Sequence, residues 1–90
     1  MRLALCLALI ASPTLAASPD AWDEFRLMVQ SACAALVQDP GTVKIEVNPF
    51  GSESFGAALV SVTYPQGTDR MICIVDKATG RAELTAPFGE

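Results

Sequence analysis

Two cysteines place the strongest constraint on how this chain folds. Cys33 and Cys73 lie forty positions apart in a chain of 90 residues. In an oxidising compartment such a pair forms a structural disulfide, and closing a loop of that length stabilises a fold by about 4 kcal/mol. A small chain whose core supplies only about 3–5 kcal/mol depends on such a crosslink. The sequence therefore predicts that the segments around the two cysteines pack against each other.

The start of the chain has the features of a secretory signal. A short basic start is followed by an apolar run over residues 3–11 and by small residues up to Ala16. The apolar run is shorter than the roughly 20 residues that cross a bilayer. We therefore expect residues 1–16 to be a signal peptide and residues 17–90 to form one domain without a membrane span. Its expected location is the periplasm or the extracellular space, and cleavage after Ala16 or Ala17 stays open.

Export also decides which cysteines pair. Cys6 lies inside the signal and is removed with it, so Cys33 and Cys73 remain as an even pair. A thiol-redox protein would favour two cysteines in a C-x-x-C turn at a helix start, whereas these two are widely separated. We expect a structural disulfide and keep the thiol-redox protein as an alternative.

The segment after the signal is predicted to form one helix. Ser18 can cap it, Pro19 suits its first turn, and acidic residues follow at the positive end of the helix dipole. Apolar residues then recur every three or four positions and form one stripe: Trp22, Phe25, Val29, Ala32, Cys33 and Leu36. The break at residues 39–41 ends the helix. Because Cys33 lies within the stripe, its sulfur points toward whatever the helix packs against.

Four strands are predicted after the helix. Residues 42–48 alternate, with Val43, Ile45 and Val47 on one face and polar side chains on the other. Three further strands are separated by turns and span residues 57–64, 70–76 and 81–86. The expected fold class is therefore α+β, with one N-terminal helix packed on a four-stranded antiparallel meander sheet and stapled by the disulfide.

The alternation of apolar and polar residues also predicts how the strands pair. The last turn pairs Asp76 with Arg81. This pairing sets Cys73 opposite Leu84, and the preceding hairpin matches the same face if Val62 lies opposite Cys73. The face that carries Cys73 then meets the helix, so two separate elements direct their sulfur atoms into the same interior.

The sequence shows no constellation typical of an enzyme. It contains no histidine, which excludes Ser-His and Cys-His nucleophile systems and His-ligated metals. Its carboxylates are accounted for by the helix start and the turns, and no calcium or phosphate loop motif is present. The formal net charge of −4, with basic residues spread along the chain, argues against a nucleic-acid groove. We expect a protein that is not an enzyme, with no cofactor, no metal and no nucleic-acid partner.

The candidate binding surface consists of aromatic and aliphatic residues. Phe50 and Phe55 lie in a Gly- and Ser-rich loop, where they either tuck beneath the sheet edge or point outward as anchors. Ile72 and Ile74 occupy the middle of the predicted outer face, either as ordinary exposed side chains or as a partner surface. The sequence leaves both alternatives open.

Two segments resemble PepSY domains, namely residues 34–43 (AALVQDPGTV) and residues 74–81 (IVDKATGR). Those small exported modules run from a helix through a Pro-Gly-like break into a strand meander that ends in a Val-Asp-x-x-Thr-Gly hairpin. The resemblance covers residues 20–86, and the chain departs from it in having the pair Cys33 and Cys73. It implies protease inhibition or cell-envelope regulation and carries over no catalytic residues.

These observations lead to one main hypothesis about function. We expect a small exported domain that binds another protein, as an inhibitor or as an accessory to an envelope or secreted partner. An alternative is a small apolar ligand held between helix and sheet near Trp22, Phe50 and Phe55.

Overall fold

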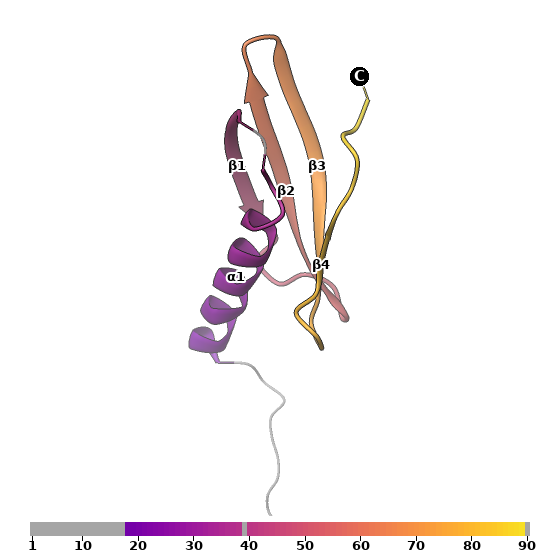
Figure 1. Cartoon of the computed structure of the whole chain (residues 1–90). Helices are drawn as coiled ribbons and strands as arrows, with labels where there is room; N and C mark the ends of the chain where they lie inside the picture. The colour runs from indigo at the N-terminus through magenta and orange to yellow at the C-terminus, as the bar shows by residue number, and fades with distance from the viewer. Residues whose placement is uncertain (1–17, 39, 90) are drawn as a thin grey trace, which may run out of the picture.

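A computed structural model describes residues 18–38 and 40–89 of the chain. One helix precedes four strands: α1 (Pro19–Ala34), β1 (Thr42–Val47), β2 (Phe55–Tyr64), β3 (Gly67–Asp76) and β4 (Ala82–Leu84). The strands form one antiparallel sheet in the order β1-β2-β3-β4, and α1 crosses one face of it (Figure 1). The predicted fold class is therefore confirmed. The predicted signal peptide, residues 1–16, lies outside the described residues.

The helix begins where the sequence predicts and ends earlier. Ser18 Oγ accepts a hydrogen bond from Ala21 N at 3.1 Å, and Pro19 occupies the first turn. The last helical residue is Ala34, and the chain continues in a tight turn in which Leu36 N donates to Cys33 O at 3.1 Å. Leu36 is consequently 39% exposed, so its predicted place in the helical stripe is wrong. It lies beyond the last regular turn of the helix, where the 3.6-residue period no longer applies.

The core lies between α1 and the face of the sheet that α1 covers, which we call the inner face. The buried side chains come from α1, β2 and β3: Val29, Cys33, Ala58, Val60, Val62, Met71, Cys73 and Val75. The helix packs closely on β2 at Gly56, where an added Cβ would lie 2.7 Å from Val29 Cγ2 and 3.0 Å from Phe25 Cζ. An added side chain would force Val29 or Phe25 to shift, so the glycine lets α1 pack closely on the sheet.

The last hairpin has the predicted register. Asp76 N donates to Arg81 O at 2.8 Å, and Cys73 lies opposite Leu84. The strand β4 is shorter than the predicted span of residues 81–86. Beyond Leu84 the chain still follows β3, but a side chain replaces a backbone acceptor, because Thr85 Oγ1 accepts from the N–H of Ile72 at 2.9 Å.

The β2–β3 hairpin is paired differently from the prediction. Ala58, not Val62, lies opposite Cys73, and Val62 lies opposite Asp69. The predicted register is wrong because the turn is tight, so pairing begins at Tyr64 and Gly67 instead of after a longer turn. The pairing is displaced by an even number of residues. The same side chains therefore stay on the inner face.

Candidate functional site

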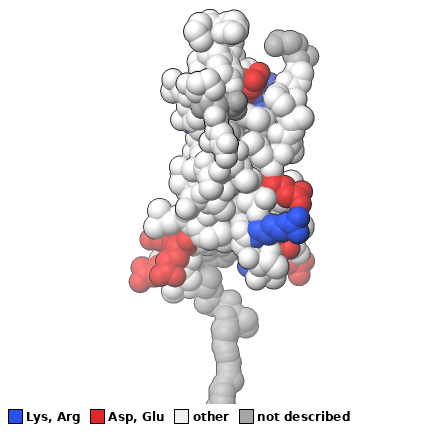
Figure 2. Space-filling view, viewed as in Figure 1, with Lys and Arg blue, Asp and Glu red and all other residues white. Residues whose placement is uncertain are grey.

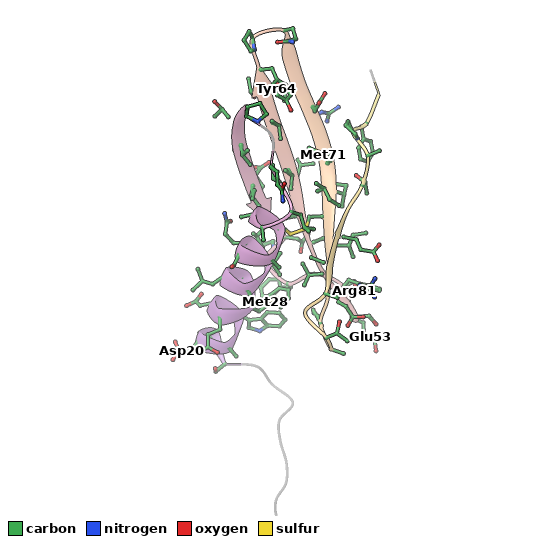
Figure 3. All side chains as sticks on the ribbon, viewed as in Figure 1. Asp20, Met28, Glu53, Tyr64, Met71 and Arg81 are labelled. Carbon is green, nitrogen blue, oxygen red and sulfur yellow. A yellow bond between two sulfur atoms is a disulfide. The ribbon has the colours of Figure 1, made fainter. Side chains whose placement is uncertain are left out.

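The disulfide joins the helix to the centre of the sheet. Cys33 of α1 is bonded to Cys73 of β3, with 5.9 Å between their Cα atoms (Figure 3). Both residues are fully buried. The predicted disulfide is confirmed. A thiol-redox role needs a sulfur that solvent or a substrate can reach, and neither of these sulfurs is exposed.

Three aromatic rings and two cations meet near the start of α1, and we call them the aromatic-cation cluster. Trp22 contacts Phe25 and Phe50 edge-on, with ring centroids 5.5 Å and 4.8 Å apart. The Lys77 ammonium lies 5.5 Å from the Trp22 ring centroid and 5.0 Å from that of Phe25. The Arg26 guanidinium lies 5.3 Å from the Phe50 ring centroid. The cluster joins α1, the β1–β2 loop and the β3–β4 turn through cation–π and ring contacts.

The β1–β2 loop is held in place by hydrogen bonds from distant parts of the chain. Lys77 Nζ donates to Phe50 O at 3.0 Å and to Ser52 O at 2.7 Å. Within the loop, Asn48 Oδ1 accepts from Gly51 N at 2.8 Å, and Gly51 adopts a φ of +70° that favours glycine. The loop thereby holds Phe50 against Trp22, although Phe50 remains 53% exposed. Phe50 therefore fits neither predicted alternative fully, because it is not buried beneath the sheet edge and it does not point freely into solvent.

Phe55 points to the opposite side of the sheet from Phe50. Its neighbour Gly56 faces α1, and successive side chains of a strand alternate between faces, so Phe55 lies on the face that α1 leaves open. We call this the outer face. It carries an apolar group on β2 and β3, which we name the outer stripe: Phe55, Ala57, Leu59, Ile72 and Ile74. Ala57 lies directly opposite Ile74, and Leu59 opposite Ile72, so these side chains contact across the strands.

The outer stripe is partly exposed and has a polar rim. Phe55 and Ile74 are 44% and 38% exposed, respectively. Three open hollows of about 410, 420 and 370 Å³ lie along the stripe and share several of its residues. Charged residues border these hollows: Glu46, Asp76, Arg81 and Glu83. Figure 2 shows a mixed group of acidic and basic side chains near β4, separate from the acidic group at the start of α1. An apolar centre with a charged rim is the usual anatomy of a protein interface.

The structure therefore divides the predicted binding residues between two places. Phe55, Ile72 and Ile74 come together on the outer face, whereas Phe50 belongs to the aromatic-cation cluster near the helix. Sequence reasoning missed Leu59 as a member of the outer stripe. The signal was present, because Leu59 alternates with the buried residues of β2 and so had to face outward. It also missed Lys77, whose contacts with the loop depend on the folded chain.

Among the residues that the structure describes, no three Cys, Asp or Glu side chains gather closely enough to hold a metal ion. No helix in the same part of the chain is long and apolar enough to cross a membrane. Comparison with protein-family models, with curated proteins and with solved structures finds no match. The resemblance to PepSY domains therefore stays a prediction.

Proposed function

We propose that this chain is an exported, non-catalytic domain that binds another protein through the outer face of its sheet. The observation that carries the proposal is the outer stripe, in which Phe55 and Ile74 are large apolar side chains with substantial exposure. The helix covers the opposite face (Figure 1). A contiguous apolar group bordered by charged residues is the kind of surface that a protein partner covers.

The rigidity of the fold favours binding through a preformed surface. The disulfide between Cys33 and Cys73 ties the sheet to the helix behind it, and the loop before Phe55 is held by Lys77. A surface that is already in its binding conformation loses less conformational entropy on association, which is typical of small inhibitors and accessory domains. An inhibitory or accessory role toward an envelope or secreted protein also agrees with the resemblance to PepSY domains.

Export is supported by the disulfide, which is compatible with an oxidising compartment outside the cytoplasm. The periplasm or the extracellular space is therefore the proposed location. The signal-like segment of residues 1–16 supports the same location from the sequence.

A small apolar ligand between helix and sheet is less well supported. Trp22 and Phe50 contact each other, but Phe55 lies on the far side of the sheet, so the three residues do not line one site. The close approach at Gly56 leaves less room than a methyl group requires. The geometry favours the outer face as the binding surface.

The test compares capture of partners by the wild-type protein and by two matched variants. Ile74→Lys places a charge in the outer stripe, whereas Leu27→Lys places one on the solvent-facing side of α1, where Leu27 is 68% exposed. Each protein, folded and oxidised, is used to capture proteins from an envelope extract under non-reducing conditions. We expect the wild type and Leu27→Lys to retain the same protein and Ile74→Lys to lose it. Equal retention by all three proteins, or retention by none, would contradict the proposal.

A further inference from the structure

β1 is an edge strand whose outer side has no neighbouring strand among the described residues. Asn48 N, just after β1, donates to Ala57 O at 2.8 Å, which shows which residues of β1 direct their backbone groups toward β2. Backbone groups of an antiparallel strand point alternately to its two sides. The N–H and C=O groups of Val43, Ile45 and Val47 therefore point away from β2, where another strand can pair with them.

The opposite edge of the sheet, at β4, is protected against pairing with another strand, in contrast to the open edge at β1. β4 has only three residues. After it, the chain stays beside β3, with Thr85 N donating to Ile72 O at 2.9 Å and Phe88 N donating to Arg70 O at 2.8 Å. Short strands, irregular pairing and proline are three of the features by which proteins block an edge, and this edge has all three, including Pro87.

None of these features occurs in β1. Its sequence, TVKIEV, has no proline or glycine, and all of its six residues pair regularly with β2. Its apolar side chains, such as Ile45, lie on the inner face, and its charged ones, Lys44 and Glu46, lie on the outer face. Among the described residues an ion pair joins Arg26 to Asp23, whereas neither Lys44 nor Glu46 forms one within the chain.

The sequence of β1 is complementary to itself in one antiparallel register. When two β1 strands are aligned with Ile45 opposite Ile45, Lys44 of each copy lies opposite Glu46 of the other. The same register sets Val43 opposite Val47 and brings all the outward backbone groups into hydrogen-bonding positions. Registers centred on Lys44 or on Glu46 would set like charges opposite each other, and a shift by one residue would mix the two faces.

We propose that two copies of this chain pair through β1 in this register and form one continuous sheet. The two-fold axis passes through Ile45 perpendicular to the sheet, so both helices lie on one side of the dimer. Val43, which is 39% exposed in the single chain, is covered by Val47 of the second copy. The two outer stripes then lie on the same side, so the dimer presents the surface of the proposed function twice.

The proposal is tested by reversing the charges one at a time and then together. In Lys44→Glu or Glu46→Lys, the opposed side chains carry like charges, whereas the double variant Lys44→Glu/Glu46→Lys restores opposite charges. The oxidised proteins are studied by sedimentation equilibrium over a micromolar to millimolar concentration series. We expect a dimer for the wild type and the double variant, and a dissociation constant raised by about tenfold or more in each single variant.

Mixing the two single variants gives the most specific result. One chain then offers two glutamates and the other two lysines, so a heterodimer forms more strongly than either homodimer. Glu24→Lys, a charge reversal at an exposed position of α1, is the matched control and leaves association unchanged. Circular dichroism of each variant verifies the fold.

Three results would overturn the proposal. One is a wild-type protein that stays monomeric over the whole concentration series. Another is a pair of single variants that associate as the wild type does and show no preference for each other. The third is association that survives both charge reversals but is lost in Ile74→Lys, because copies would then meet through the outer stripe. Loss of partner capture alone would not contradict the dimer, so each of the two proposals can be refuted without the other.

Discussion

Both faces of the sheet carry apolar side chains, but those of the inner face are buried and those of the outer face are partly exposed. On β3 the inner residues Met71, Cys73 and Val75 are 5% exposed or less, whereas Ile74, which lies between Cys73 and Val75, is 38% exposed. The difference does not come from hydrophobicity, since isoleucine is at least as apolar as its neighbours. It comes from the single helix, which can cover only one face. In so small a domain, an apolar face without a helix is available for binding.

The largest expected effect comes from removing the disulfide that ties the inner face to the helix. The double variant Cys33→Ala/Cys73→Ala is expected to lower the free energy of unfolding by about 2–5 kcal/mol, because the unfolded chain regains the freedom of a long loop. Urea denaturation followed by circular dichroism measures this loss. A midpoint equal to that of the oxidised wild type would show that the inner face holds together without the crosslink.

Truncating one residue on each face of β3 compares the faces directly. Met71→Ala removes a buried side chain and is expected to cost about 2–3 kcal/mol, since a cavity remains in the core. Ile74→Ala on the outer face is expected to cost about 1 kcal/mol or less, because water already reaches the side chain. Thermal and urea unfolding of the two variants provide the measurement. Equal losses would mean that the outer face belongs to the core, and the comparison would fail.

Adding a methyl group to Gly56 tests how closely the helix lies on the inner face. Gly56→Ala places a Cβ 2.7 Å from Val29 Cγ2, so it is expected to destabilise the fold by about 1–3 kcal/mol through overpacking. Gly89→Ala is the control, since nothing lies within 4 Å of its added Cβ. If both variants unfold at the wild-type urea concentration, the helix does not approach β2 as described.

A small effect is expected at the β1–β2 loop, which contacts α1 and leads into β2. Lys77→Met removes the hydrogen bonds to Phe50 O and Ser52 O and the cation–π contact with Trp22. A loss of about 1 kcal/mol is expected. Hydrogen exchange of the loop amides should accelerate, whereas Arg81→Met, an exposed control on the same turn, should leave it unchanged. Unaltered exchange in Lys77→Met would show that the loop is held by its own turns alone.

The sequence predicts which face of the sheet a side chain lies on, but it does not predict the arrangement that the loops and turns impose. The helical period and the strand alternation predict that the side chains of Cys33 and Cys73 point into the same interior, because both patterns are local properties of each element. The same alternation places Ile72 and Ile74 outside. It could not predict which residues of β2 lie opposite β3, because registers that differ by an even number of residues keep the same faces. The length of the turn after Tyr64 decided among them.

The separation of Phe50 from Phe55 shows the same limit at the candidate site. Both phenylalanines lie in one loop-like segment of the sequence, and nothing local directs them to opposite sides. In the structure Phe55 begins β2 and follows its alternation, whereas Phe50 is held against Trp22 by a loop whose backbone accepts hydrogen bonds from Lys77. Those contacts join residues far apart in the sequence, so they exist only in the folded chain.

The sequence by itself determined the α+β class, the helix start at Ser18 and Pro19, and the pairing of the cysteines. Each of these depends on a residue pattern or on the chemistry of a few neighbours. Only the tertiary structure decided the β2–β3 register, the extent of the outer stripe and the contrast between the open edge at β1 and the protected edge beyond β4. These properties depend on turn geometry and on which segments come to lie beside each other, and such long-range contacts leave no local period in the sequence.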